Sequence, residues 1–372
     1  MLEKNFSLLK LNKFKVECIA DQYFSFVETD ELAEFSRNLI RDDSKYFILG
    51  GGSNVLFSKN LNGIVIHPQN SKIEIIEERA ERILVRAYAG LNWDAFVNYC
   101  TKKGWHGLEN LTLIPGNVGA APVQNIGAYG TEVSEWIHAV HCYNIKIKEE
   151  ATLSNNECSF SYRHSEFKNR PELIIIAVDF LLFKSQTKKI TSQFGALKGS
   201  LAIGQDAVRA LLLAAQSISL SSKTKWKPKL SFIKIRDLLS LSAIPVNLKR
   251  RLVRFIRLRT LPNPDIVGNV GCFFKSPIVT DQKATEIEAS IPNAQIFSHK
   301  QGYKKISAGD LIKACGWAGK RVGDVGVDAK RPIVLLNHGT QSGLEIYDLY
   351  RKIQRDVELK FNVKLEPEVV IE

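Results

Sequence analysis

The sequence predicts an α+β fold. Strand-like runs outnumber helical ones in the first 185 residues or so, and helices and strands mix again after Asp265. The chain has 372 residues, which leaves room for two or three domains. Its 45% hydrophobic and 24% charged residues are typical of a soluble globular protein.

A glycine turn interrupts the first strands. Tyr46–Leu49 is a short apolar run that ends in Gly50-Gly51-Gly52-Ser53-Asn54, and Val55-Leu56-Phe57 follows. Since the chain returns to an extended run rather than a helix, this is not a Rossmann dinucleotide turn. The backbone amides of such a turn can hold a pyrophosphate, although a tight hairpin would have the same sequence.

One helix and several strands are expected next. Asn92 is suited to cap a helix that has Trp93, Phe96, Val97 and Cys100 on one face. Leu173–Phe183 is a long apolar run typical of a buried strand. The other expected strands are Gly63–His67, Lys72–Ile76, Ile83–Ala89 and Ile137–Ile147.

The stretch Gly107–Gly130 differs in composition from its surroundings. Its 24 residues contain five Gly, three Ala and two Pro but one charge, Glu109, in a chain with 51 Lys and Arg. Small residues allow a close approach of backbone to backbone or to a flat ligand. The stretch is either the wall of a site for a large, planar, uncharged group or a packed glycine-rich loop.

Residues 185–260 have a helical and basic character. Helical spacing is present in Asp206–Ile218, Ile233–Leu241 and Asn247–Ile256. Lys249–Arg259, KRRLVRFIRLR, is the densest basic patch of a chain with net charge +12. The interleaved apolar residues predict an amphipathic helix whose basic face is either solvated or a site for anionic ligands or surfaces.

The last part follows Leu261-Pro262-Asn263-Pro264. Ser342 and Glu345 have capping-box spacing, and a helix with Ile346 and Val357 on its apolar face is expected behind them. A final strand is expected at Val363–Ile371.

Composition also limits the class of protein. No apolar run reaches the roughly 18 residues of a membrane helix, and the N-terminus lacks the layout of a signal peptide, so we expect a cytosolic protein. The six cysteines are at least 16 residues apart, which predicts free thiols rather than a metal site or a disulfide framework.

Three short stretches carry side chains suited to chemistry. Cys272 lies between Gly271 and two phenylalanines, either as a buried structural cysteine or as a proton donor that a ligand can reach. Glu366 and Glu368 would share one face of a strand, either as solvated acids or as a functional pair. Arg163 is either a surface arginine or a carboxylate-binding group.

Together these stretches resemble the UDP-N-acetylenolpyruvoylglucosamine reductases, the MurB flavoenzymes of peptidoglycan synthesis. The pieces occur in family order, and the second and fourth are the most specific. They read ILGGGSNVLF, GLENLTLIPGNVGAAPVQNIGAYG, SYRHSEFK, GNVGCFFKSP, SAGDLI and LEPEVV. The segment Ser192–Leu197 resembles the family form that has the longer substrate loop.

The resemblance implies an arrangement of domains. It implies a PCMH-type (vanillyl-alcohol-oxidase-like) FAD-binding α+β domain at residues 1–195, to which the last strand, 363–372, could return. Residues 196–260 would be a basic helical connector or insertion, and 261–372 the substrate-binding domain. A monomer that binds a UDP-sugar, without nucleic acid or a membrane segment, is expected.

The resemblance also implies a reaction. NADPH reduces FAD, and flavin N5 then passes hydride to the enolpyruvyl ether of the UDP-sugar, which gives UDP-N-acetylmuramate. Arg163 would polarise the substrate carboxylate, Cys272 would donate the proton where many members have serine, and Glu368 would be the catalytic glutamate. The residues implied for FAD are Gly50, Gly51, Gly52, Ser53, Asn54, Pro115, Gly116, Gly119, Ala120, Asn125 and Gly127.

The substrate side differs from the family pattern. The implied substrate residues are Tyr129, Phe194, Arg257, Lys275 and Ser276. Phe194, Thr260 and Ser276 replace an expected tyrosine, lysine and asparagine, and Arg259 or Lys275 could supply replacement charge. A diverged flavin-binding homologue without turnover is therefore one alternative, and a nucleic-acid binder that uses Lys249–Arg259 is another.

Overall fold

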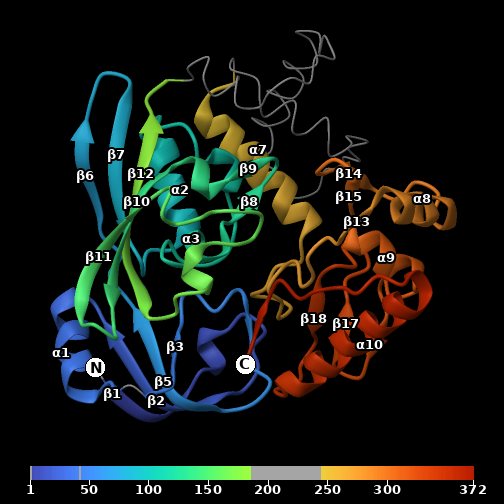
Figure 1. The fold of residues 1–372 in the computed structure, drawn as a ribbon, viewed down its shortest axis with the longest axis horizontal. Helices are drawn as coiled ribbons and strands as arrows, with labels where there is room; N and C mark the ends of the chain where they lie inside the picture. The colour runs from blue at the N-terminus through green and yellow to red at the C-terminus, as the bar shows by residue number, and fades with distance from the viewer. Residues whose placement is uncertain (1, 42, 186–243) are drawn as a thin grey trace. The chain divides into compact units, whose positions relative to one another are not determined.

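The computed structural model describes residues 2–41, 43–185 and 244–372. Contacts divide the chain into two compact units, and each has its own core. Unit one contains 1–69 and 258–372, and unit two contains 70–257. Both combine sheets with helices, so the expected α+β class is confirmed (Figure 1). The expected helices Asp206–Ile218 and Ile233–Leu241 lie outside the described residues.

Unit one begins with a four-stranded sheet in the order β1-β2-β5-β3, in which β2 and β3 run parallel to β5. Two three-stranded sheets, β13-β15-β14 and β16-β17-β18, lie in its C-terminal part. Its N-terminal elements are β1 (Leu2–Ser7), η1 (Leu9–Leu11), β2 (Ile19–Phe26), α1 (Thr29–Leu39), β3 (Tyr46–Ile48), β4 (Val55–Leu56) and β5 (Leu61–Pro68). Its C-terminal elements are β13 (Ile278–Thr280), α8 (Asp281–Ser290), β14 (Ile296–Ser298), β15 (Tyr303–Ile306), α9 (Ala308–Ala314), β16 (Arg321–Val322), β17 (Val325–Val327), β18 (Leu335–Asn337), α10 (Gly343–Phe361) and β19 (Val370–Ile371).

One core joins the two ends of the chain in unit one. The rings of Phe14 and Phe273 lie 6.2 Å apart, and both side chains are buried. The side-chain amide of Asn337 donates to the carbonyl of Phe14 at 2.7 Å. These shared contacts explain why the compact units do not follow the sequence boundaries at 195 and 260.

Unit two is built on an antiparallel five-stranded sheet in the order β11-β10-β12-β7-β6 (Figure 1). Its central strand, β12 (Leu173–Phe183), has the bounds predicted from its apolar run. Trp93 and Phe96 of α2 pack against Phe180 of this strand and cover one face of the sheet. The remaining elements are β6 (Ile73–Glu78), β7 (Arg82–Tyr88), α2 (Trp93–Lys102), η2 (Glu109–Leu111), α3 (Ala120–Gln124), β8 (Gly127–Ala128), β9 (Thr131–Glu132), η3 (Val133–Glu135), β10 (Ile137–Asn144), β11 (Glu149–Ser154), η4 (Glu166–Lys168) and α7 (Val246–Thr260).

Helix ends test the local predictions. Asn92 caps α2 as predicted, because its side-chain oxygen accepts from the amide of Ala95 at 3.0 Å. The capping box of Ser342 and Glu345 is wrong: the Ser342 side chain caps nothing, and Glu345 accepts from the hydroxyl of Thr340 at 2.7 Å. Thr340 also accepts from the Ser342 amide, so its hydroxyl bridges the N-cap backbone and the Glu345 carboxylate.

The strands β5, β6, β7 and β10 form near the predicted ranges with bounds that differ by up to three residues, and two further elements differ in length. The expected strand Val363–Ile371 is reduced to β19, which pairs in parallel with β4 and brings the end of the chain back to the N-terminal segment. The basic helix is longer than Asn247–Ile256. None of the helices in the described part of the chain combines the length and apolar character of a membrane span.

Candidate functional site

The glycine turn of unit one is a fixed connection between two sheets. β3 pairs with β5 and β4 pairs with β19, so the hairpin alternative is wrong. Gly52 has φ +59°, and a Cβ there would lie 1.8 Å from the carbonyl oxygen of Leu11, so only glycine fits. Gly50, Gly51, Ser53 and Asn54 are partly exposed, which leaves this turn accessible to a ligand.

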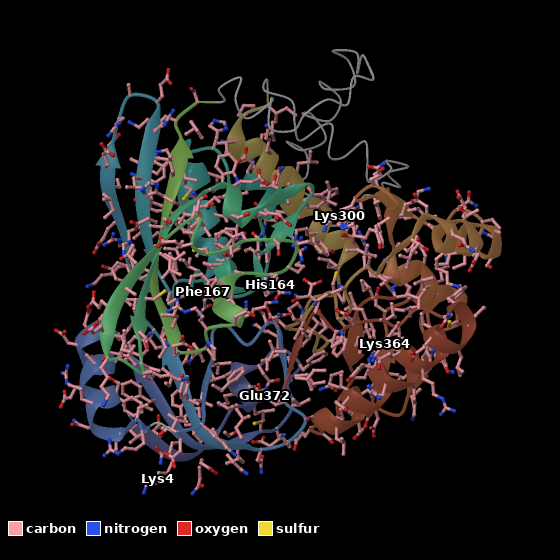
Figure 2. The ribbon with its side chains drawn as sticks, in the orientation of Figure 1. Lys4, His164, Phe167, Lys300, Lys364 and Glu372 are labelled. Atoms are coloured by element: carbon pink, nitrogen blue, oxygen red, sulfur yellow. The ribbon has the colours of Figure 1, made fainter. Side chains whose placement is uncertain are left out.

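Glu368 is attached to this turn. The side-chain amide of Asn54 donates to the Glu368 carbonyl at 3.3 Å, and the Val370 amide donates to the Asn54 carbonyl at 3.0 Å. The Glu368 amide also donates to the carbonyl of Phe273 at 2.8 Å. Three segments predicted separately, at Asn54, Cys272 and Glu368, are therefore joined by hydrogen bonds in unit one. Glu372, labelled in Figure 2, marks the end of the third segment.

Cys272 differs from most other cysteines of the chain. All six are free thiols; Cys18, Cys100, Cys142 and Cys158 are buried, whereas Cys272 is exposed. Burial raises the pKa of Cys18 to about 11, because an apolar environment disfavours the thiolate. The interpretation of Cys272 as a buried structural cysteine is therefore wrong, because the residue is exposed.

Lys275 and Glu366 form an ion pair. The ammonium lies 3.3 Å from the Glu366 carboxylate, and the Lys275 amide donates to the Glu366 carbonyl at 2.8 Å. The Glu366 side chain is 69% exposed, so the pair contributes little to stability. Ser276 follows and is partly buried.

The uncharged stretch of unit two is held by the start of α2. The amide of Trp93 donates to the carbonyl of Gly116, and its indole donates to the carbonyl of Leu111, both at 2.9 Å. The amide of Gly119 donates to the carbonyl of Ala89, and a Cβ on Gly119 would lie 2.6 Å from the Ala89 methyl. Pro115 and Ala120 remain exposed. The stretch is thus held by hydrogen bonds, and its exposed residues, such as Pro115 and Ala120, carry no charge.

Arg163 lies against the end of the same stretch. Its guanidinium donates to the carbonyl oxygens of Asn125 at 3.3 Å and Gly127 at 2.9 Å. His164, labelled in Figure 2, is the next residue and marks this loop. The Asn125 side chain is used internally, since it bonds with Glu132, Ser161 and Ser134. The sequence-predicted residues Arg163, Asn125 and Gly127 are therefore brought together in unit two.

The single charge of the stretch is buried. Burial favours a raised pKa for Glu109, but hydrogen bonds from His106 and the Gly107 amide and the charge of Lys249 outweigh it, so the pKa is lowered. Burial lowers the pKa of Lys249, which is 2% exposed, and Glu109 partly offsets that effect. Lys249 is a buried partner of this stretch and not part of a solvated face.

The other substrate-side residues are more dispersed. Tyr129 is buried and packs with Leu252 and Val253 of α7. Arg257 is a partly buried residue of α7, and Thr260 is the last residue of that helix. Phe194 lies outside the described residues. The sequence interpretation missed Asp94 of α2, which binds two arginines of α7; the one signal for it in the sequence is an acidic residue in the first turn of a capped helix.

The fold and these backbone segments define an FAD-binding protein. Residues 20–144 match the family model described as an FAD binding domain. Residues 263–372 match a second model, the C-terminal domain of UDP-N-acetylenolpyruvoylglucosamine reductase.

Complete relatives identify the family. A UDP-N-acetylenolpyruvoylglucosamine reductase from Bacteroides fragilis is 34% identical over 372 residues, which is 99% of each chain. One from Amoebophilus asiaticus is 36% identical over 376 residues, covering 100% of this chain and 99% of the relative. The chain belongs to the UDP-N-acetylenolpyruvoylglucosamine reductase family. The crystal structure of the reductase from Thermus caldophilus has the same fold, with a TM-score of 0.63, 19% identity and coverage of 100% and 98% of the two chains.

The residues present fit FAD. The turn at Gly50–Asn54 offers backbone amides without a competing acidic side chain, as a pyrophosphate requires. The exposed residues of the second stretch, Pro115, Ala120 and Gly130, are uncharged, which suits an isoalloxazine ring. The one carboxylate in that stretch, Glu109, is buried and paired, so it does not repel the cofactor.

Proposed function

We propose that this protein is an FAD-dependent reductase that converts UDP-N-acetylglucosamine enolpyruvate to UDP-N-acetylmuramate with electrons from NADPH. The observation that carries the proposal is the linkage of Asn54, Glu368 and the Phe273 neighbour of Cys272 within unit one. A turn suited to pyrophosphate is thereby connected to an accessible thiol and a carboxyl group. In this proposal residues 1–195 would be the FAD-binding domain and residues 261–372 the substrate-binding domain.

Bound FAD would supply the hydride for the vinyl carbon of the substrate. Arg163 would stabilise the negative charge that develops on the substrate carboxylate, because its guanidinium is already oriented by two carbonyl oxygens. Its fork-shaped donor set suits a carboxylate better than a lysine does.

Cys272 would give its proton to the substrate carbon that gains carbanion character. Its exposure supports this role, since a buried thiol would have neither access nor a proton of ordinary acidity. Glu368 would be the catalytic carboxyl group. Hydrogen bonds between its backbone and two neighbouring segments hold its Cα in place.

Positive charge for the substrate diphosphate would come from Arg257 and Lys275, with Ser276, Tyr129 and Phe194 completing the substrate side. Lys275 is paired with an exposed acid, Glu366, which substrate could displace at little cost. We further propose that the enzyme acts as a monomer in the bacterial cytosol.

The absorption spectrum of the purified protein tests this proposal. The protein is expected to be yellow, or to become so when FAD is added, and NADPH is expected to bleach it. Colourless protein that cannot be reconstituted with FAD would contradict the proposal. A diverged homologue is the second candidate, favoured by Thr260 and Ser276; it would bind FAD but show no oxidation of the reduced flavin by the enolpyruvyl sugar.

A further inference from the structure

Asp94 connects α2, the glycine-rich stretch and the basic helix α7. Its carboxylate accepts a hydrogen bond from the backbone amide of Leu113 at 2.8 Å. It also accepts from Arg250 at 3.0 Å and from Arg254 at 3.3 Å. All four residues belong to unit two.

Leu113 needs this hydrogen bond because its backbone is in an unfavourable conformation. Its φ of +58° lies in the left-handed region, which a branched side chain disfavours. Pro115 and Gly116, which are expected to contact FAD, follow Leu113 by two and three residues. An acceptor that holds the Leu113 amide therefore also fixes where this pair of residues lies.

The arginines hold the carboxylate in place. The side chains of Asp94 and Arg250 are 20% and 13% exposed, so their attraction is shielded from solvent. Burial lowers the pKa of Arg250, and the negative charge of Asp94 opposes that effect. Arg254 is 44% exposed and adds a weaker contact.

A second contact also connects α7 to the glycine-rich stretch. Lys249, next to Arg250, is buried and interacts electrostatically with Glu109, which lies four residues before Leu113. The basic run was one candidate for an anion site. Three of its residues, Lys249, Arg250 and Arg254, instead interact with two acids of unit two, Asp94 and Glu109.

We propose that Asp94, held by Arg250 and Arg254, is a positioning residue for the FAD-binding backbone at Leu113–Gly119. The flavin contact rests on the proposed function. Without Arg250, the carboxylate can turn to water and Leu113 loses its acceptor. A smaller fraction of the protein then has the conformation that binds FAD, and the apparent affinity for FAD falls in proportion to that fraction.

The test is the dissociation constant of FAD from the deflavinated full-length protein, measured by quenching of flavin fluorescence well below the unfolding temperature of each variant. Arg250→Gln is expected to raise it about fivefold or more, and Arg250→Lys to restore part of the loss. Arg251→Gln, at an exposed arginine of the same helix, is the matched control and is expected to leave it unchanged. In an Asp94→Asn background, Arg250→Gln should add little, because the two residues act as one unit.

Arg250→Gln protein that is less thermally stable but binds FAD as tightly as the wild type would overturn the proposal, since the contact would then be structural only. If Arg250→Gln does not fold, Arg254→Gln provides the same comparison at a more exposed site. It is expected to raise the dissociation constant of FAD by a smaller factor. An unchanged dissociation constant would count against the proposal. Wild-type protein that binds no FAD would refute the proposed function itself.

Discussion

The guanidinium of Arg163 donates a 2.9 Å hydrogen bond to the carbonyl oxygen of Gly127, and it lies against the place that a Cβ at this position would occupy. A Cβ on Gly127 would be 3.0 Å from Nη1 of Arg163 and 2.9 Å from the carbonyl oxygen of Thr131. The glycine thus allows the backbone to orient the arginine that is expected to meet the substrate carboxylate.

Gly127→Ala is therefore expected to displace the guanidinium and to slow oxidation of the reduced flavin by the enolpyruvyl sugar by about tenfold or more. Stopped-flow absorbance of that half-reaction is the measurement. Gly309→Ala is the control, because its nearest heavy atom is 3.7 Å away. Equal rates for Gly127→Ala and the control would show that the orientation of Arg163 is unimportant.

Substitutions of Cys272 should affect only one of the two half-reactions, the oxidation of the reduced flavin by substrate, and not the reduction of the flavin by NADPH. Cys272→Ser should retain substantial turnover, because a hydroxyl can also donate a proton. Cys272→Ala should be reduced by NADPH at the normal rate and then stall with substrate, because no proton donor remains. The control is Cys315→Ser, at a partly buried thiol. Normal steady-state turnover of Cys272→Ala would rule out the proton-donor role.

Gln354 of α10 supports the segment that carries Glu368. Its buried amide donates to the carbonyl oxygen of Leu365 at 2.6 Å and accepts from Arg351 at 2.9 Å. Gln354→Met should lower the free energy of unfolding by about 1–3 kcal/mol, because the Leu365 carbonyl loses its donor. Urea unfolding measures this, with Arg355→Met at an exposed position as the control. A midpoint like that of the wild type would mean that the segment does not depend on this contact.

His67 predicts a dependence of stability on pH. Burial lowers its pKa from 6.5 to about 4, and its Nδ1 lies 2.7 Å from the hydroxyl of Tyr23. Between these values the unfolded chain binds a proton that the folded protein does not, so stability decreases as pH falls from about 6.5 to about 4, by up to about 3 kcal/mol.

His67→Gln should reduce this loss, as measured by urea unfolding at several pH values in that range. His138→Gln, at an exposed histidine, should leave it unchanged. An identical pH dependence in His67→Gln and the wild type would show that folding does not lower the pKa of His67.

Local patterns in the sequence were enough to predict several elements. The long apolar run at Leu173–Phe183 favoured a buried strand, and the polar Asn92 before an apolar helical face favoured a cap; the structure has both. The candidate residues were found because each occurs in a short motif, and the hydrogen bonds of Asn54, Glu368 and Arg163 connect such motifs.

Long-range geometry could not be predicted in the same way. The turn before α10 places the hydroxyl of Thr340 between the Ser342 amide and the Glu345 carboxylate, which the Ser342–Glu345 spacing does not reveal. The pairing of Asp94 with Arg250 joins residues 156 positions apart. The basic helix therefore had two open interpretations until its acidic partners were known.

The most direct test of the account is an anaerobic titration of the NADPH-reduced protein with UDP-N-acetylglucosamine enolpyruvate, followed by flavin absorbance. The account predicts that one equivalent of the enolpyruvyl sugar per flavin restores the oxidised spectrum and that UDP-N-acetylmuramate is formed. Flavin that stays reduced in protein with a full complement of FAD would contradict it.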